Sequence, residues 1–217
     1  MRVPFNSSPA PGVGHPPSPP RATWHRAVPR LQNAAVTLRE ISVRDASALL
    51  SHLDDPIALR HVAPCPATIE GLRRFARWAH EKRRGGRLIC FAIIPAGHTR
   101  PVGLMQLWPL DPGGTTAEWG VVIGPSLWGT GIFPAAASLL FQFVFDGLGV
   151  VRLEARTAVT NQRANAALRK IGGRTEGRLR YSLGAARTTA ATVLWAFQAS
   201  TARIAVREAW SASRRSQ

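Results

Sequence analysis

The sequence predicts an α+β fold (α/β in some classifications), in which about four helices flank a central sheet of about seven strands. Three observations predict it. Between residues 36 and 123, short apolar or alternating segments are separated by Gly, Pro and Asp, as successive strands are. The strand at residues 116–123 runs through a glycine-containing turn straight into an apolar helix. After that helix the pattern is strand, helix and hairpin.

The first predicted elements precede residue 87. Val36 to Val43 alternates as a first strand. Asp45 is suited to be the N-cap of a helix through His52. Thr68 begins a second helix, which ends near Gly85-Gly86. The apolar residues of this helix recur at helical spacing and predict its buried face: Leu72, Phe75, Ala76 and Ala79.

Three antiparallel strands are predicted next. They are Arg87 to Ile94, Pro101 to Leu107 and Thr116 to Ile123. Asp111-Pro-Gly-Gly114 supplies the turn before the last of them, because these residues favour turn conformations.

An apolar helix is predicted from Phe133 to Leu148. One stripe of it carries Phe133, Ala136, Ala137, Leu140 and Val144, and the opposite side carries Leu139 and Phe143. A helix that is apolar on both sides is expected to be buried on both.

The last predicted elements follow this helix. Leu153 to Val159 is a strand, and Asn161 to Ile171 is a helix closed by Gly172-Gly173. Arg178 to Leu183 and Thr192 to Phe197 form a hairpin through Gly184.

Composition divides the chain into three parts. Residues 1–33 contain eight prolines and four arginines without periodicity, and we expect them to be disordered. Residues 34–199 form the folded domain. Residues 200–217 are expected to be a basic tail, at most an amphipathic helix.

The turn between residues 124 and 132 has the features of an anion site. Gly129 and Gly131 let the backbone approach a ligand without a Cβ in the way. Pro134 fits the first helical turn, where its missing N–H costs nothing. The unpaired N–H groups and the macrodipole of the helix start favour negative charge, and a pyrophosphate is a suitable guest.

This turn and the residues after it resemble the GNAT superfamily of acetyl-CoA-dependent acetyltransferases. The resemblance rests on Trp128-Gly-Thr-Gly131, on Asn161, and on Lys170-Ile-Gly172 nine residues further on. It is closest to the RimJ/RimL-type branch of ribosomal-protein N-terminal acetyltransferases. It covers about Val36 to Ala199, and it implies the GNAT fold with a mixed sheet.

The resemblance also implies how acetyl-CoA is held, with no metal. The pyrophosphate is expected on the backbone amides of Leu127, Trp128, Gly129, Thr130, Gly131 and Ile132. Val121, Val122 and Ile123 are expected to pair with the pantetheine arm, whose amides need partners once buried. The N–H of Val122, or of an immediate neighbour, is expected at the thioester carbonyl. Asn161 is expected to bond the pantetheine or to brace the strand-to-helix turn.

For proton removal from the amine, the resemblance points to Glu118. Several GNAT acetyltransferases place a glutamate at this position, just before the cofactor-binding segment. The alternative is an exposed or arginine-paired glutamate. Glu154 is the rival base, but Arg152 and Arg156 beside it favour a structural ion pair.

The expected general acid is missing from its family positions. Many GNAT enzymes carry a tyrosine where this chain has Leu168, and the RimL-type serine is Ala164 here. Tyr181, the one tyrosine of the chain, is a substitute acid if the hairpin folds back; the alternative is a surface strand residue.

The formal net charge is +16, and of the 28 basic residues only Lys82 and Lys170 are lysine. Residues 34–199 carry a net +9. Such a surface attracts phosphate-rich partners, including the cofactor's adenosine phosphate, RNA and ribosomes. The alternative is solvated surface arginines.

Other classes are disfavoured. Two cysteines are too few for a disulfide framework, and no paired His or Cys spacing indicates a metal site. No signal peptide is evident, and the apolar stretch Ile132 to Val151 is interrupted by polar residues, so we expect no membrane span. A cytoplasmic monomer or homodimer is expected.

The sequence therefore predicts an acetyl-CoA-dependent N-acetyltransferase acting on a primary amine, either a protein N-terminus or a small amine. The alternative is a catalytically degenerate CoA-binding module or a basic nucleic-acid-binding module. The absent tyrosine and serine favour the alternative, whereas the intact turn with Asn161 favours catalysis.

Overall fold

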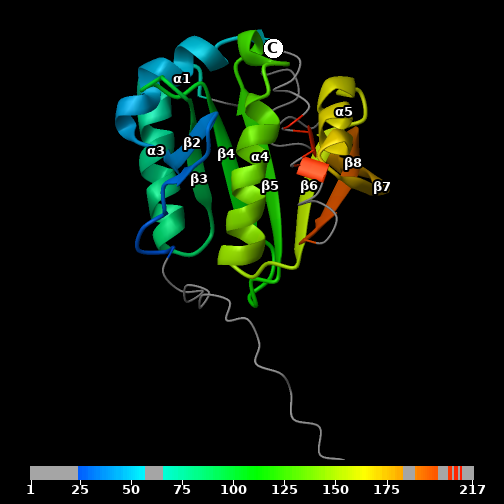
Figure 1. Cartoon of the computed structure of the whole chain (residues 1–217). Helices are drawn as coiled ribbons and strands as arrows, with labels where there is room; N and C mark the ends of the chain where they lie inside the picture. The colour runs from blue at the N-terminus through cyan, green and yellow to red at the C-terminus, as the bar shows by residue number, and fades with distance from the viewer. Residues whose placement is uncertain are drawn as a thin grey trace, which may run out of the picture.

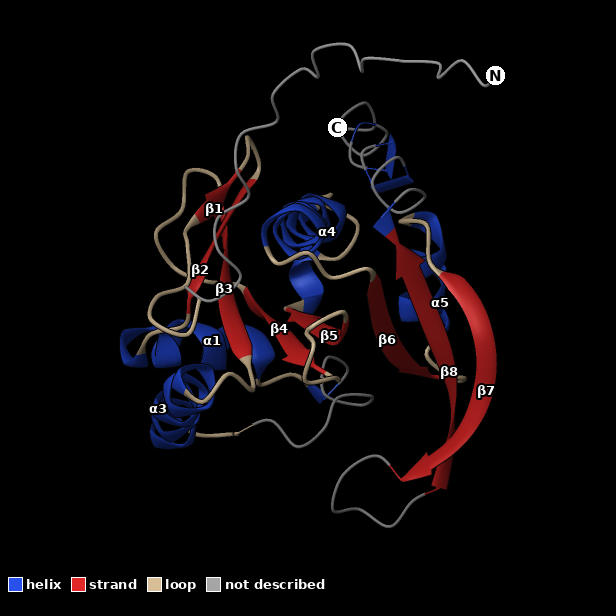
Figure 2. Ribbon diagram, turned by 90° about the horizontal axis from the view of Figure 1, so that it is seen from below, coloured by secondary structure: helices blue, strands red, loops and turns tan. Residues whose placement is uncertain are grey.

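The computed structural model describes residues 24–56, 66–182 and 189–199, with residues 205, 206, 208, 209 and 211. Its centre is one eight-stranded sheet in the order β1-β2-β3-β4-β5-β6-β8-β7. Helices α4 and α5 lie on one face, and α1 and α3 lie on the other (Figures 1 and 2). The predicted α+β class with a mixed sheet is confirmed.

The strands are β1 (Leu31–Gln32), β2 (Val36–Glu40), β3 (Ile89–Pro95), β4 (Gly103–Pro109), β5 (Thr116–Ile123), β6 (Arg152–Ala158), β7 (Arg174–Ser182) and β8 (Thr189–Gln198). The helices are α1 (Ala46–Leu53), α3 (Ile69–Arg84), α4 (Ile132–Gln142) and α5 (Gln162–Lys170). Short 3₁₀ turns span Val43–Asp45 and Pro125–Leu127, and a π-helical turn spans Phe143–Gly147. All neighbouring strands pair antiparallel except β5 and β6, which are parallel.

Two hydrophobic cores hold the layers together. The larger lies between the sheet and α4 with α5, where the Trp119 ring packs against those of Phe133, Phe141 and Phe197. The smaller lies under α1 and α3 and includes Leu72, as predicted from helical spacing. Each fully buried Phe or Leu of such cores stabilises the fold by about 1.5–3 kcal/mol.

Helix α4 is buried on both sides, which confirms its apolar pattern. Leu139 and Ala136 are both buried, although the two point in different directions around the helix. The observed helix is shorter than predicted, because after Gln142 the backbone widens into the π-helical turn. There the Leu148 N–H donates to the Phe143 carbonyl at 2.9 Å.

The cap of α1 differs from the prediction. Asp45 makes no side-chain cap on α1. Its carboxylate instead accepts from the Ser42 N–H at 2.7 Å and binds the Arg39 guanidinium at 2.6 and 2.7 Å. Asp45 therefore belongs to a capping box on the 3₁₀ turn that precedes α1. Thr68 caps α3 as predicted, accepting from the Gly71 N–H at 3.0 Å.

The folded part begins earlier than residue 34, which corrects the expectation of disorder for residues 24–33. Trp24 is buried in the main core, and β1 pairs with β2. The Arg83 guanidinium donates to the His25 carbonyl, and Asn33 Nδ2 donates to the Ala135 carbonyl at 3.0 Å. Apolar and hydrogen-bonding residues anchor this segment despite Pro29. Residues 1–23 lie outside the described part.

The C-terminal boundary needs a similar correction. Val206 and Ala209 are buried in the main core, so this part of the expected tail packs on the domain. The hairpin strands are longer than predicted, with β7 beginning at Arg174 and β8 at Thr189. Its predicted turn at Gly184 lies outside the described residues. No helix among the described residues is both long and apolar enough to cross a membrane.

Candidate functional site

The sheet opens between β5 and β6. The two strands pair only over Thr116–Glu118 and Arg152–Glu154, where Glu118 lies opposite Glu154. Beyond that point β5 continues to Ile123 and β6 continues to Ala158, each bonded only to its outer neighbour, β4 or β8. Both strands run towards the end of the molecule at which α4 and α5 begin (Figure 1). An open pair of strand edges therefore faces the starts of two helices.

The register decides which amides face this opening. The Gly124 N–H donates to the Val102 carbonyl at 3.1 Å, so these two opposed residues form a hydrogen-bonded pair. Along an antiparallel ladder every second pair of opposed residues is hydrogen-bonded, and the next such pair includes Val122. Val122 therefore directs its N–H and C=O towards β4. Val121 and Ile123 direct theirs towards the opening, and the Ile123 carbonyl accepts from Trp128 Nε1 at 2.9 Å. The expectation for Val122 thus moves to an immediate neighbour, Val121 or Ile123.

The turn between β5 and α4 has the geometry of an anion site. Gly129 and Gly131 both have φ of +83°, a left-handed conformation that favours glycine. At Gly129 a Cβ would meet nothing within 4 Å, so the backbone angle and not crowding requires the glycine. Gly131 is the N-cap of α4 and provides no side-chain cap. The first N–H groups of α4, at Ile132 and Phe133, therefore have no side-chain cap beside the opening.

The start of α5 stands next to this turn. Asn161 caps the helix, accepting from the Ala164 N–H at 3.1 Å, so of its two expected roles the bracing one is observed. The Arg163 guanidinium lies over the Trp128 ring, 4.7 Å from its centroid. Trp128 therefore holds a positive charge beside the turn. Sequence reasoning missed Arg163, although a cation in the first turn after Asn161 was a usable signal.

The two candidate carboxylates share one arginine. Arg156 binds Glu118 through Nη1 and binds the Glu154 Oε2 at 3.3 Å. Glu154 is also bonded to Arg152 at 2.8 Å. The structural ion pair expected for Glu154 is therefore observed. Of the two alternatives given for Glu118, the glutamate paired with arginine is the one observed. The Glu118 side chain is 25 % exposed against 11 % for Glu154, so solvent reaches Glu118 more easily.

The network ends at β7. Arg152 also binds Glu176 on β7, and these hydrogen bonds raise the pKa of Arg152 and lower the pKa of the Glu176 carboxyl. These ion pairs therefore connect Glu118, at the closed end of the opening, to the β7–β8 hairpin. Glu118 and the members on β6 face away from α4, because residues alternate along a strand and their neighbours Trp119, Leu153 and Ala155 lie in the main core.

His52 is a second titratable group near the opening that sequence reasoning did not select. It lies in the last turn of α1, against the end of β5. A Cβ at Gly124 would be 3.2 Å from His52 Nδ1 and 3.0 Å from its carbonyl oxygen. Only a long-range contact between α1 and β5 brings this imidazole here, so local sequence carried no signal for it.

Neither of the two expected positions in α5 provides the general acid. Leu168 is 4 % exposed and packs in the main core. Ala164 has no donor group. Tyr181 pairs with Ala190 through its backbone in β7, but its side chain lies outside the described part. Among the described residues, no group of three or more His, Cys, Asp or Glu is arranged to hold a metal ion.

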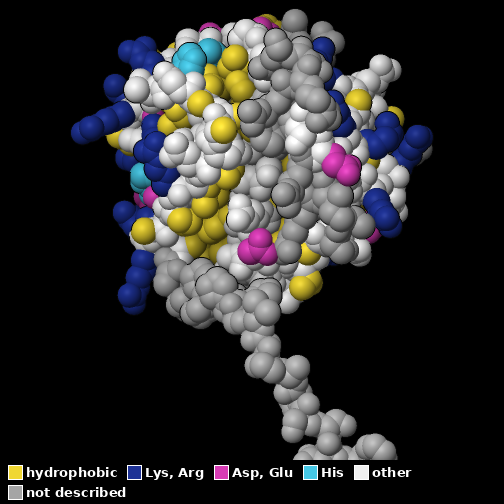
Figure 3. Space-filling view, viewed as in Figure 1, with side chains coloured by type: hydrophobic (Ala, Val, Ile, Leu, Met, Phe, Trp, Pro, Cys, Tyr) yellow, Lys and Arg dark blue, Asp and Glu magenta, His cyan; other side chains and the backbone are white. Residues whose placement is uncertain are grey.

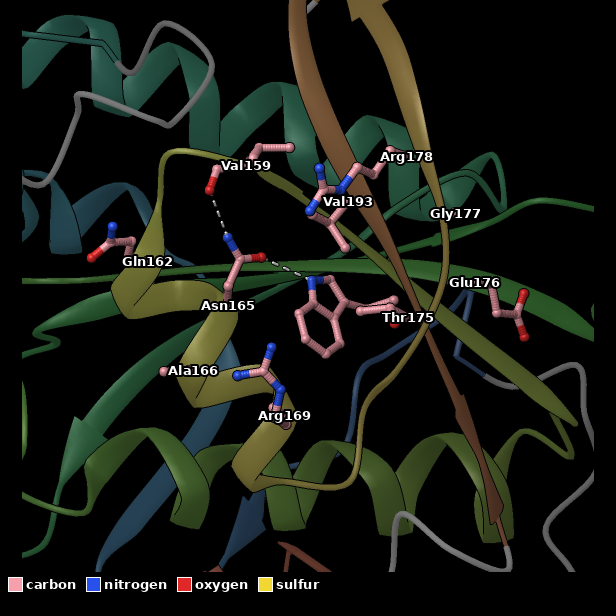
Figure 4. Close-up of a pocket in the computed structure, with 11 residues that line it drawn as sticks. Val159, Gln162, Asn165, Ala166, Arg169, Thr175, Glu176, Gly177, Arg178 and Val193 are labelled. Carbon is pink, nitrogen blue, oxygen red and sulfur yellow. Dashed lines mark hydrogen bonds between the residues drawn. The ribbon is translucent and has the colours of Figure 1, made fainter.

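A cavity of about 640 Å³ lies between α5 and the β7–β8 hairpin, separate from the opening (Figure 4). Its floor is a satisfied polar network. Asn165 donates to the Ala158 carbonyl at 3.0 Å and accepts from Trp195 Nε1 at 3.1 Å. No residue of β5 or of the α4 turn lines this cavity. It is therefore not part of the candidate site.

Comparison with known proteins agrees with this geometry. Residues 35–174 match the family described as an acetyltransferase (GNAT) domain. The chain belongs to the GNAT acetyltransferase family. The uncharacterised N-acetyltransferase p20 of Bacillus licheniformis is 25% identical over 151 residues, which are 69% of this chain and 85% of that protein. The protein is thus an N-acetyltransferase of the family that uses acetyl-CoA.

Two solved structures share the fold. A GCN5-related N-acetyltransferase from Brucella melitensis superposes with a TM-score of 0.74 at 22% identity, covering 90% of this chain and 86% of that one. Mycobacterium smegmatis RimJ, in complex with CoA-disulfide, superposes with a TM-score of 0.73 at 24% identity. That match covers 86% of this acetyltransferase and 95% of RimJ.

Proposed function

We propose that this acetyltransferase transfers the acetyl group of acetyl-CoA to a primary amine, either a protein N-terminus or a small amine. The observation that carries the proposal is the opening between β5 and β6 beside the uncapped start of α4. An extended ligand with amides along its length and a pyrophosphate near one end fits these two features together.

The donor would be held by backbone groups and one cation. The amides of Gly129, Gly131 and Ile132 suit the pyrophosphate, whereas those of Leu127 and Trp128 already donate to the Gly124 and Pro125 carbonyls at 3.0 and 3.1 Å. Arg163 adds a positive charge beside this turn. Val121 and Ile123 offer backbone groups to the pantetheine arm, since their side of β5 carries no strand partner beyond Glu118. An N–H of this pair would donate to the thioester carbonyl oxygen, where negative charge grows during transfer.

The amine would enter from the face that carries Glu118 and α1. In acetyl transfer the amine nitrogen bonds to the carbonyl carbon, the carbon–sulfur bond breaks, and the sulfur leaves as thiolate. The nitrogen must give up a proton. Glu118, more exposed than Glu154, would accept it directly or through water, and His52 at the end of β5 is the other acceptor within this face.

A protein N-terminus is the acceptor that the RimJ/RimL-type motifs favour. The fold similarity to M. smegmatis RimJ supports this assignment. The test is release of free thiol from acetyl-CoA with a panel of peptides that differ in their first residue, alongside small amines. Mass spectrometry then locates the acetyl group on the product. Thiol release with small amines alone would exclude the peptide acceptor.

A CoA-binding protein without turnover is the second candidate. The pairing of Glu118 with Arg156 and the burial of Leu168 favour it, since one occupies the base and the other leaves no acid. Calorimetric binding of CoA with no thiol release across the whole panel would select this candidate. Absence of CoA binding would refute both.

A further inference from the structure

The outward face of α3 carries a tryptophan between two cations. Arg74, Trp78 and Lys82 are four residues apart and therefore form one ridge along the helix. Lys82 Nζ lies 5.8 Å from the centroid of the Trp78 ring, and the Phe75 ring is 5.6 Å away on the side of the core. We call Arg74, Trp78 and Lys82 the α3 ridge.

The fold does not need this tryptophan on the surface. The opposite side of α3 supplies the core contacts, with Leu72, Ala76 and Ala79 buried. Trp78 is 42 % exposed, and it is the one aromatic among the large exposed hydrophobic residues of the described part. An exposed indole contributes little to folding, but it offers a flat face to a ligand.

The acids beside the ridge, Glu70 and Glu81, form no ion pair with its two cations. Glu70 lies one turn before Arg74, but it binds Arg77 at 2.8 Å and Arg73 at 3.7 Å instead. Within the described ranges, no carboxylate forms an ion pair with Arg74 or Lys82. Lys and Arg side chains gather along the left edge of Figure 3, the side on which Figure 1 places α3.

We propose that the α3 ridge binds single-stranded nucleic acid. Cations along a helix match backbone phosphates, and an exposed indole between them stacks on a base. An acidic peptide would satisfy the cations but would leave the indole without a stacking partner. A membrane surface would require a broad apolar face on the helix, whereas the apolar face of α3 is buried in the core. The surface lies on α3 and is independent of acetyl transfer.

The test measures binding of a fluorescein-labelled single-stranded RNA of about 15 nucleotides, by anisotropy over a salt series. Wild type is compared with Arg74→Gln/Lys82→Gln and with Trp78→Ala. The matched control is Lys170→Gln/Arg174→Gln, which removes the same charge from α5 and β7. The ridge double variant should bind at least about tenfold more weakly, and its salt slope should fall by about 1.4.

Trp78→Ala should weaken binding about tenfold without changing the salt slope, because stacking involves no counterion release. The affinity for a single-stranded DNA of the same sequence, measured in the same way, shows which of the two nucleic acids the ridge prefers. Equal weakening by the control variant would overturn the proposal, since the whole protein's field would then be responsible. Tighter binding to poly-glutamate or to anionic lipid vesicles than to either nucleic acid would also overturn it. The double variant keeps the test valid if Trp78→Ala fails to fold.

Discussion

Replacing Gly129 by glutamate should abolish most of the affinity for CoA, and the structure allows the effect to be separated from strain. Any residue other than glycine at φ +83° costs about 1–2 kcal/mol of backbone energy. Space is not limiting, because a Cβ there would contact nothing within 4 Å. Gly129→Gln therefore has the same strain and bulk as Gly129→Glu, and the two variants differ only in charge.

The charge difference can be estimated. A carboxylate about 5 Å from one phosphate charge, at an effective dielectric of about 20, is repelled by about 3 kcal/mol. That corresponds to a Kd about 100-fold higher for Gly129→Glu than for Gly129→Gln. Isothermal titration calorimetry of CoA at low and high salt measures the two Kd values, and added salt should reduce the difference between them. Equal affinities for the two variants would refute the placement of the pyrophosphate at this turn.

The remaining predictions concern the amine side and the chain's first ordered segment. Glu118→Gln should lower turnover about 10²- to 10⁴-fold with CoA affinity intact, because it removes basicity and keeps shape; wild-type turnover at every pH would clear Glu118 of this role. His52→Asn should leave CoA affinity unchanged and lower turnover, because it removes the second proton acceptor of this face; wild-type turnover would leave His52 as a packing residue against Gly124. Deleting residues 1–33 should destabilise the fold by at least about 3 kcal/mol through loss of buried Trp24, and lower Tm by about 6–12 °C in a thermal melt. Deleting only residues 1–23 is the matched control, and an equal loss would show that Trp24 is not the anchor.

Local patterns gave much of the fold. The alternation of β5 predicted its observed bounds, Thr116–Ile123, because side chains of a strand alternate between two faces regardless of its partners. Thr68 and Asn161 were identified as helix starts because a cap bonds an N–H only three residues away. The glycine turn was found for the same reason, since a left-handed backbone angle is a property of single residues.

Several features of the site depend on contacts between distant parts of the chain. The register of β4 on β5 decided that Val121 and Ile123, not Val122, face the opening. Arg156 reaches Glu118 because β5 and β6 lie side by side, and that contact gave Glu118 an ion-pair partner.

By itself the sequence determined the family, the anion-binding turn and the order of elements, because these rest on hydrogen bonds and periodicities within a few residues. Only the tertiary structure decided which strand edge is open, which arginine holds Glu118, and that Trp24 is buried. Those outcomes depend on register and packing across the sheet, where a shift of one residue turns each backbone amide and each side chain to the opposite side.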